Sequence, residues 1–258
     1  MDISGKRTLI TGAAGGLGAA IATELAQRGA KVILTGRNES ALSALAADLG
    51  GEVVVADLGV RTDVDRLSDV LDDTEIFVNN AGIGTDGLLD LDAAAIDQVI
   101  DVNLRSPIHL TRHFAAARIA SDRPGHAVLI GSLSGLAATP ATSMYNATKF
   151  GLRGFALSFR QDLHDTCVGL SLVEPGFIRD AGMFADSPID LPPGVRTKSP
   201  ADVATAVVEA IEKDRAEIFA APVELRFAST LGMVAPALSA SIQRRLGVAE
   251  RKAAQNRH

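Results

Sequence analysis

Two side chains able to take part in proton transfer lie four residues apart. Tyr145 is the only tyrosine of the chain, and Lys149 follows it in the run YNATK, within a predicted long helix over 142–164. At this spacing both side chains lie on one helix face. A phenol with a pKa of about 10 is a poor acid–base catalyst at neutral pH, and a neighbouring ammonium lowers that pKa. We therefore expect an acid–base pair here, although the spacing alone also fits an ordinary helix surface.

Further polar residues stand where predicted strands end. Ser132 follows the fifth strand, thirteen residues before Tyr145, and its hydroxyl could hold a substrate oxygen. Ser134 competes for that role, and a turn stabilised by either hydroxyl is the alternative. The run NNAG over 79–82 ends the fourth strand and could tie neighbouring strand ends together. Asn103 lies in a helical stretch, which disfavours Asn unless its amide makes local hydrogen bonds.

A glycine-rich turn connects the first strand to the first helix. The run TGAAGGLG over 11–18 has the spacing Gly12-x-x-x-Gly16-x-Gly18, which differs from the common G-x-G-x-x-G. Such a turn lets backbone N–H groups approach a pyrophosphate at the N-terminus of the helix. Its position after the first strand of an alternating chain favours a nucleotide site over a simple tight turn.

The end of the second strand bears on cofactor choice. An NAD site usually has an acid there, about 20 residues after the glycines, for the ribose 2′-hydroxyl. Here the chain has Gly36 and Arg37, so a cation stands near the expected place of the acid. This favours the 2′-phosphate of NADP(H) over NAD(H), although Glu39 is close and Arg37 could be a solvated residue at a helix start.

The elements that must position these residues alternate between short apolar strands and helices. We predict strands over 8–10, 31–35, 52–56, 75–79, 126–130, 168–173 and 217–220, and helices over 16–28, 39–49, 64–71, 93–120 (one or two), 142–164 and 201–213, the last with Ser199 and Pro200 as its cap. Strands apolar on both faces indicate a parallel sheet covered on both sides. The alternation predicts one α/β domain with a doubly wound sheet of about seven strands, whose carboxyl edge binds the ligand.

Taken together, these motifs resemble those of the short-chain dehydrogenase/reductase family, over about residues 6–220. The resemblance implies a Rossmann-type fold and an NAD(P)-dependent oxidoreductase acting on a carbonyl or secondary alcohol, with apolar character expected of the substrate. It implies a catalytic tetrad of Asn103, Ser132, Tyr145 and Lys149. It also implies a cofactor site formed by Gly12, Ala14, Gly15, Gly16, Leu17, Gly18, Arg37, Asp57, Leu58, Asn80, Ala81, Gly82, Tyr145, Lys149, Pro175, Gly176 and Ile178.

The chain departs from the family pattern after Pro175 and Gly176. Asp180 stands where the family usually has a threonine that contacts the nicotinamide carboxamide. Asp180 could accept a hydrogen bond there, or pair with Arg179 instead. The following segment, 181–198, has little periodicity and is expected to recognise the substrate, with Met183, Phe184, Ile189 and Leu191 as possible pocket residues, unless it is an ordinary surface loop.

The last part of the chain is predicted to be a helical appendage over 222–258, following a catalytic domain over 1–221. Its apolar positions are Leu225, Phe227, Leu231, Val234, Leu238 and Ile242, followed by a basic tail. Packing on the domain or on a sister subunit is the expected role, and an interfacial membrane helix is the alternative. Pro236 argues against one uninterrupted helix.

Composition excludes several classes of protein. A formal net charge of −6 argues against nucleic-acid binding, and a single cysteine excludes an internal disulfide framework. The five histidines show no spacing typical of metal ligands, so no metal is expected. The N-terminus lacks an apolar signal core, and the longest run without Asp, Glu, Lys or Arg, 127–148, is rich in polar residues and Gly. We expect a cytoplasmic homodimer or homotetramer that does not bind membranes. A catalytically vestigial nucleotide-binding regulator and an epimerase or lyase of the same family remain alternatives.

Overall fold

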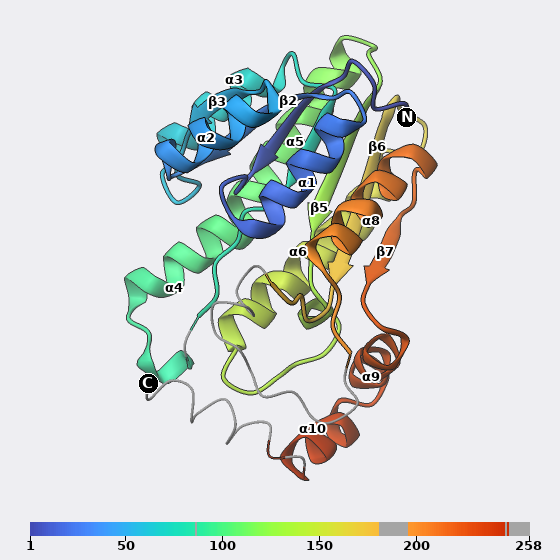
Figure 1. Cartoon of the computed structure of the whole chain (residues 1–258). Helices are drawn as coiled ribbons and strands as arrows, with labels where there is room; N and C mark the ends of the chain where they lie inside the picture. The colour runs from blue at the N-terminus through green and yellow to red at the C-terminus, as the bar shows by residue number, and fades with distance from the viewer. Residues whose placement is uncertain (86, 181–195, 246, 248–258) are drawn as a thin grey trace.

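The computed structural model shows a seven-stranded parallel sheet with helices on both faces (Figure 1). It describes residues 1–85, 87–180, 196–245 and 247. The strand order is β3-β2-β1-β4-β5-β6-β7. The strands are β1 (Arg7–Thr11), β2 (Lys31–Gly36), β3 (Glu52–Val55), β4 (Ile76–Asn79), β5 (Gly125–Ile130), β6 (Val168–Pro175) and β7 (Glu217–Ala220). The predicted strands and the doubly wound arrangement are thus confirmed.

The helices follow the predicted alternation, with shifts of a few residues at their ends. They are α1 (Gly16–Gln27), α2 (Glu39–Leu49), α3 (Arg61–Leu71), α4 (Ala93–Ile100), α5 (Ser106–Ala120), α6 (Ser143–Asp162) and α8 (Pro200–Lys213), with short segments η1 (Leu88–Asp90), η2 (Asp101–Arg105) and η3 (Leu133–Gly135). Ser199 and Asp202 cap α8 reciprocally, and Pro200 takes the first turn, as the sequence predicts.

Two apolar layers hold the helices to the sheet, because successive residues of each strand face opposite sides. Ile10 and Leu34 point to the layer that also contains α1, α2 and α8. Leu9 and Ile33 point to the other layer, beneath α3, α5 and α6. Burial on both sides explains why these strands are continuously apolar. Because every pair of neighbouring strands is parallel, all their carboxyl ends lie at the same edge of the sheet.

The region predicted as one or two helices over 93–120 contains a π-helical segment. Helix α4 runs into η2, a π-helix of five residues, before α5 begins at Ser106. π-Helical segments are rare and are frequent at functional sites. This one contains Asn103, whose side chain it directs into the molecule.

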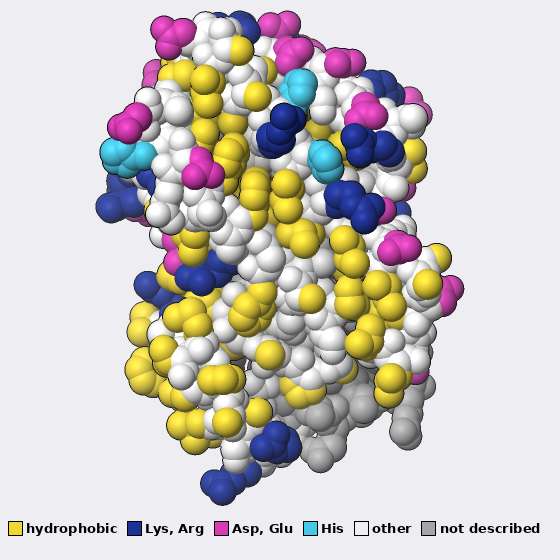
Figure 2. All heavy atoms as spheres, turned by 180° about the vertical axis from the view of Figure 1, so that it is seen from behind, with side chains coloured by type: hydrophobic (Ala, Val, Ile, Leu, Met, Phe, Trp, Pro, Cys, Tyr) yellow, Lys and Arg dark blue, Asp and Glu magenta, His cyan; other side chains and the backbone are white. Residues whose placement is uncertain are grey.

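Two helices follow β7, namely α9 (Val223–Val234) and α10 (Pro236–Arg245). The break at Ala235 and Pro236 agrees with the predicted effect of that proline. Figure 2 shows hydrophobic side chains gathered at this end of the molecule. Phe227, Val234, Leu238 and Ile242 are exposed, whereas Leu225 packs against a small cluster beside η3. In the described part of the chain, no helix has the length and apolar character needed to span a membrane.

Candidate active site

The glycine turn forms the first wall of the site. Gly12 has a φ of +65°, and a Cβ on Gly18 would lie 2.2 Å from the Gly12 carbonyl oxygen, so both positions require glycine. Gly15 precedes α1, and no side chain caps that helix or places an acid in its first turn. Ala14 and Leu17 are partly buried, while Gly15 and Gly16 are exposed. Free N–H groups at this helix end suit a phosphate.

Asn80 ties β4 to the glycine turn. Its Nδ2 donates to the Thr11 carbonyl oxygen at 2.9 Å and to that of Gly12 at 3.3 Å. The Thr11 hydroxyl accepts from the backbone N–H groups of Asn80 and Ala81 at 2.9 and 3.0 Å. The NNAG run therefore fixes the turn after β1 against the end of β4, as strand-end asparagines are predicted to do.

Arg37 and Asp57 follow the neighbouring strands β2 and β3. Arg37 Nη1 lies 3.9 Å from Asp57 Oδ2, and the arginine side chain is 64% exposed. Asp57 Oδ1 accepts from the Gly59 N–H at 2.8 Å. Leu58 is buried, and its carbonyl oxygen accepts from the Ser106 hydroxyl at 2.7 Å. The guanidinium thus remains largely free at the expected place of the adenosine ribose.

Tyr145, Ser132 and Lys149 meet at the carboxyl end of β5. The Tyr145 phenol is hydrogen-bonded to the Ser132 side chain. Lys149 Nζ lies 5.7 Å from the centre of the tyrosine ring and donates to the Ile130 carbonyl oxygen at 2.8 Å. Ser134 contributes its backbone N–H to Ser132 Oγ at 3.1 Å, so its own hydroxyl is not part of this contact. The structure therefore brings together three of the four residues predicted to be catalytic.

The electrostatics differ from the sequence prediction that Lys149 lowers the pKa of Tyr145. Loss of hydration raises the pKa of the phenol to about 12, the hydrogen bond to Ser132 opposes that rise, and the charge of Glu174 adds to it. Burial lowers the pKa of Lys149 to about 8, against the attraction of Glu174. The correction has a physical reason: burial of the phenol raises its pKa, and the Lys149 ammonium gives its hydrogen bond to a backbone carbonyl oxygen and lies beside the ring.

Asn103 holds the segment that follows β4. Its Oδ1 accepts from the Ile83 N–H at 2.8 Å, and its Nδ2 donates to the Ile83 carbonyl oxygen at 2.9 Å and to Thr148 Oγ1 at 3.3 Å. Gly82 lies between this amide and the lysine, since a Cβ there would be 3.4 Å from Asn103 Oδ1 and 3.8 Å from Lys149 Nζ. Asn103 is thus separated from Lys149 by Gly82, and its own amide is hydrogen-bonded locally.

The turn after β6 lies at the same edge of the sheet, where the strands have their carboxyl ends. Gly176 N donates to the Ala220 carbonyl oxygen at 3.2 Å, Pro175 ends β6, and Ile178 is 6% exposed. Asp180 has a φ of +67° and pairs with Arg179 at 3.4 Å, which is one of the two arrangements predicted for it. Of the segment 181–198 that is predicted to recognise the substrate, residues 181–195, including Met183, Phe184, Ile189 and Leu191, lie outside the described residues.

Sequence reasoning missed Glu174, the residue before Pro175. It is fully buried beneath the Ser132 loop and accepts a hydrogen bond from the Ser132 N–H. An acid at the end of an apolar strand, on the predicted ligand edge, was the available signal. The sequence predicts that this strand ends at Val173, whereas β6 continues to Pro175 and includes Glu174.

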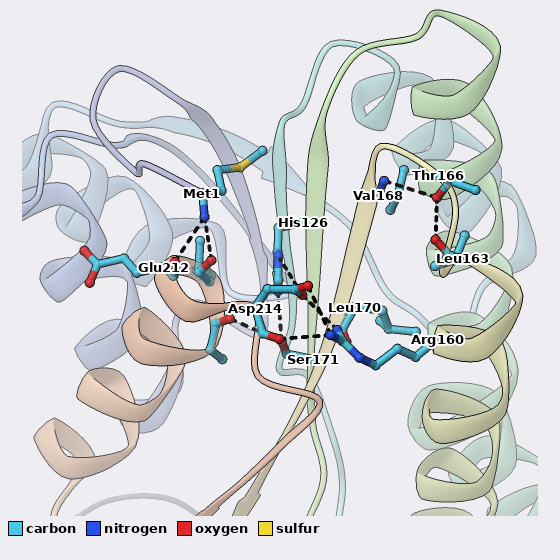
Figure 3. Close-up of polar contacts among 12 residues, drawn as sticks. Met1, His126, Arg160, Leu163, Thr166, Val168, Leu170, Ser171, Glu212 and Asp214 are labelled. Carbon is cyan, nitrogen blue, oxygen red and sulfur yellow. Dashed lines mark hydrogen bonds and ion pairs between the residues drawn. The ribbon is translucent and has the colours of Figure 1, made fainter.

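A second polar cluster lies at the opposite edge of the sheet (Figure 3). His126 Nε2 is 2.9 Å from Ser171 Oγ, and His126 Nδ1 is 3.9 Å from Asp214 Oδ1, an order that resembles a hydrolytic triad. Ser171 is fully buried and donates to the Ala210 carbonyl oxygen, so it is not placed for nucleophilic attack. We assign this cluster a structural role. Among the described residues, no group of three His, Cys, Asp or Glu is arranged to hold a metal.

The comparisons with known proteins agree with this geometry. A family model described as short chain dehydrogenase matches residues 6–190. The chain belongs to the short-chain dehydrogenase family. As a member it is an oxidoreductase of the class that acts on CH–OH groups with NAD(P).

One relative and two solved structures illustrate the similarity. Ketoacyl reductase HetN from Nostoc sp. strain PCC 7120 is 30% identical over 272 residues, covering 99% of this chain and 94% of the relative. A short-chain dehydrogenase/reductase from Burkholderia phymatum in complex with NAD has a TM-score of 0.77 and 29% identity, over 88% of this chain and 92% of its own. A short-chain dehydrogenase from Sphingobium yanoikuyae in complex with NADPH has a TM-score of 0.77 and 26% identity, over 94% and 95%.

Proposed function

We propose that this protein is a carbonyl reductase or alcohol dehydrogenase that prefers NADP(H), with Tyr145 as its acid–base residue. The observation that carries the proposal is the meeting of Tyr145, Ser132 and Lys149 at the ligand edge, with the phenol hydrogen-bonded to the serine. A bound nicotinamide cofactor supplies the hydride in reduction and accepts it in oxidation.

Each member of the tetrad has a distinct role in this proposal. In reduction, the Tyr145 phenol donates its proton to the substrate oxygen, and Ser132 holds and polarises that oxygen. Lys149 binds the ribose hydroxyls of the cofactor, and its positive charge stabilises the phenolate that remains after Tyr145 has donated its proton. Asn103 keeps Gly82 and Ile83 in place beside Lys149, and we propose that it also positions the ammonium through a water.

The residues present fit a dinucleotide. The N-terminus of α1 has free N–H groups for the pyrophosphate, and Gly12 and Gly18 leave room for close approach. In this proposal Asp57, Leu58, Asn80, Ala81 and Gly82 would contact the dinucleotide between its adenosine and nicotinamide ends, and Pro175, Gly176 and Ile178 would contact it near the nicotinamide. The exposed guanidinium of Arg37 supports a preference for a 2′-phosphate, although Asp57 lies close enough to weaken its charge.

The substrate class is a carbonyl or secondary alcohol with apolar character. The name of the Nostoc relative makes a ketoacyl thioester the first compound to test. A panel should add ketosteroids, sugars and aliphatic ketones, each with NADPH and NADH, followed by nicotinamide absorbance. Oxidation or reduction of the cofactor in step with substrate also separates net redox turnover from an epimerase or lyase reaction.

Two substitutions test the roles of the tetrad. Tyr145→Phe removes the proton donor and is expected to lower kcat by about 10²-fold or more, while cofactor binding stays near normal. Ser132→Ala is expected to lower kcat, whereas Ser134→Ala, the matched control, is expected to leave it unchanged because only its backbone N–H reaches Ser132. A Tyr145→Phe enzyme with near wild-type turnover would refute the assignment.

Arg37→Asp tests the cofactor preference. An acid at this position favours the ribose 2′-hydroxyl and repels a 2′-phosphate, so the ratio of kcat/KM for NADPH over NADH is expected to fall by at least tenfold. Arg61→Asp makes the same charge change at an exposed residue paired with Asp65 and serves as the control. Unchanged kinetics with both cofactors in Arg37→Asp would contradict the preference.

We also propose that the chain works in the cytoplasm as a homodimer or homotetramer, with residues 1–221 as the catalytic domain and 222–258 as a helical appendage. Exposed apolar side chains on two helices, Ile119 on α5 and Phe150 on α6, support assembly through these helices. Sedimentation of the full chain at micromolar concentration is expected to give a mass at least twice that of the monomer.

A further inference from the structure

Glu174 is a carboxyl group buried directly behind the candidate catalytic residues. It is the penultimate residue of β6, is fully inaccessible to solvent, and stands one residue before Pro175. Its backbone pairs with Phe219 of β7, so the surrounding sheet fixes its position. A carboxyl group without solvent is costly unless its neighbours compensate for the lost hydration. The contacts of the Glu174 carboxyl group therefore indicate its role in the site.

One carboxyl oxygen of Glu174 holds the loop that carries Ser132. The Ser132 N–H donates to Glu174 Oε2, and a Cβ on Gly131 would lie 2.3 Å from that same oxygen. Gly131 thus makes room for the carboxyl group to reach the loop. Because the Ser132 hydroxyl contacts the Tyr145 phenol, Glu174 is separated from the proton donor by only this one residue.

The other carboxyl oxygen, Oε1, has only a long ion pair with Arg153, whose Nε is 3.8 Å away, and no hydrogen bond within the described residues. Arg153 instead makes two hydrogen bonds to Glu217, at 2.7 and 3.3 Å. Lys149 gives its hydrogen bond to the Ile130 carbonyl oxygen. When Glu174 is ionised, its negative charge therefore acts on the neighbouring ionisable groups of the site.

The ionisable groups that face Glu174 make this charge variable. Burial and the carboxylate of Glu217 raise the pKa of Glu174 to about 8, while the Ser132 N–H and the charges of Lys149 and Arg153 oppose that rise. In return, the charge of Glu174 raises the pKa values of both Tyr145 and Lys149. The three groups form one electrostatically coupled cluster, drawn from β6 and α6.

We propose that Glu174 is a positioning residue of the active site, which fixes Ser132 through its backbone N–H and whose charge opposes ionisation of the Tyr145 phenol. The inference rests on the proposed function. Once Glu174 is ionised, at a pH above about 8, its charge disfavours the phenolate required for alcohol oxidation. A carboxyl group that only filled space behind the loop would have no such effect.

Two substitutions separate the contact from the charge. Glu174→Gln keeps an oxygen that accepts from the Ser132 N–H but removes the charge. Glu174→Ala removes both and leaves a cavity behind the loop. Glu217→Gln removes a carboxylate from the same cluster that does not contact Ser132 and can still accept from Arg153, so it is the matched control.

Tyr145 can be observed without any turnover, because the chain contains one tyrosine and no tryptophan. Protein labelled with ¹³C at the tyrosine ring gives one resonance whose shift reports ionisation of Tyr145. In Glu174→Gln the titration is expected to begin roughly one pH unit lower than in the wild type, the size of effect that one nearby buried charge exerts. Glu217→Gln is expected to titrate like the wild type. Far-UV circular dichroism at each pH restricts the comparison to folded protein.

Kinetics give the second readout. The pH at which alcohol oxidation reaches half its maximum is expected to fall by the same roughly one unit in Glu174→Gln, with the plateau kcat retained within about threefold. Glu174→Ala is expected to lose roughly tenfold or more of the plateau kcat, because Ser132 is no longer held. A folded Glu174→Gln protein whose Tyr145 resonance and pH profile match the wild type would overturn the inference. Absence of hydride transfer by the wild type with every substrate would instead refute the proposed function, since the resonance needs no substrate.

Discussion

Replacing His126 is expected to remove one specific contribution to the pH dependence of folding, the loss of stability caused by a buried imidazole in acid. The imidazole is 2% exposed, between β5 and β6, with Ser171 on one ring nitrogen and Asp214 near the other (Figure 3). Burial lowers its pKa to about 4, Asp214 opposes this effect, and the N-terminal ammonium and Arg160 add to it. The folded state therefore keeps His126 neutral at a pH where the unfolded chain protonates it.

The direction and size follow from this difference in pKa. Between pH 6.5 and about 4 the unfolded chain binds the proton and the folded chain does not, so His126 lowers the free energy of unfolding as the pH falls. Two and a half pKa units correspond to a ceiling of roughly 3 kcal/mol, and at pH 5 the loss is about 2 kcal/mol. Above pH 6.5 the effect vanishes, because both states hold a neutral imidazole.

Glu174 acts in the opposite direction and hides the effect in the wild-type curve. Its pKa of about 8 lies above the unfolded value, so the folded chain binds more protons between pH 4.5 and 8 and gains stability as the pH falls. A comparison of variants cancels this contribution. We therefore expect the difference in free energy of unfolding between the wild type and His126→Gln to shrink by about 2 kcal/mol from pH 7 to pH 5.

Urea unfolding followed by far-UV circular dichroism at pH 7, 6 and 5 measures this difference in a chain without tryptophan. Gln can still bond to Ser171, so its packing cost is independent of pH. His164→Gln is the control, because the His164 side chain is 84% exposed. If the difference in free energy of unfolding between the wild type and His126→Gln stayed constant from pH 7 to pH 5, the assignment of the acid effect to this buried imidazole would be wrong.

Two further predictions concern the glycine turn and the helix that packs on α1. Gly18→Ala places a Cβ 2.2 Å from the Gly12 carbonyl oxygen. The substitution is therefore expected to abolish dinucleotide binding, measured by calorimetric titration with NADP. It is also expected to lower the free energy of unfolding by about 1–3 kcal/mol, measured by urea unfolding. Ser199→Ala removes the side-chain cap of α8 and is expected to cost about 1 kcal/mol in urea unfolding without changing cofactor affinity.

The sheet could be predicted from sequence because its signals are local. Continuous apolar strands such as 31–35, with a helix after each one, match the buried strands of a parallel sheet. The order of those strands places the ends of β1, β4 and β5 side by side, which is why residues as distant as Gly12, Asn80 and Ser132 could be assigned to one edge. The π-helical segment at 101–105 was not predictable, because the apolar period continues through it from α4 to α5.

What the sequence could not supply was the electrostatics, because these depend on three-dimensional burial. The spacing of Tyr145 and Lys149 predicts that an ammonium lowers the pKa of the phenol. In the structure the ammonium donates to the Ile130 carbonyl oxygen, and the charge of Glu174, a residue of strand β6, raises the pKa of the phenol. Glu174 is 29 residues from Tyr145 in sequence and belongs to a strand with no polar motif of its own. Because Ser132 lowers and Glu174 raises the pKa of the phenol, the balance between them, and not the tyrosine–lysine spacing alone, is what we expect to set the pH dependence of the proposed alcohol oxidation.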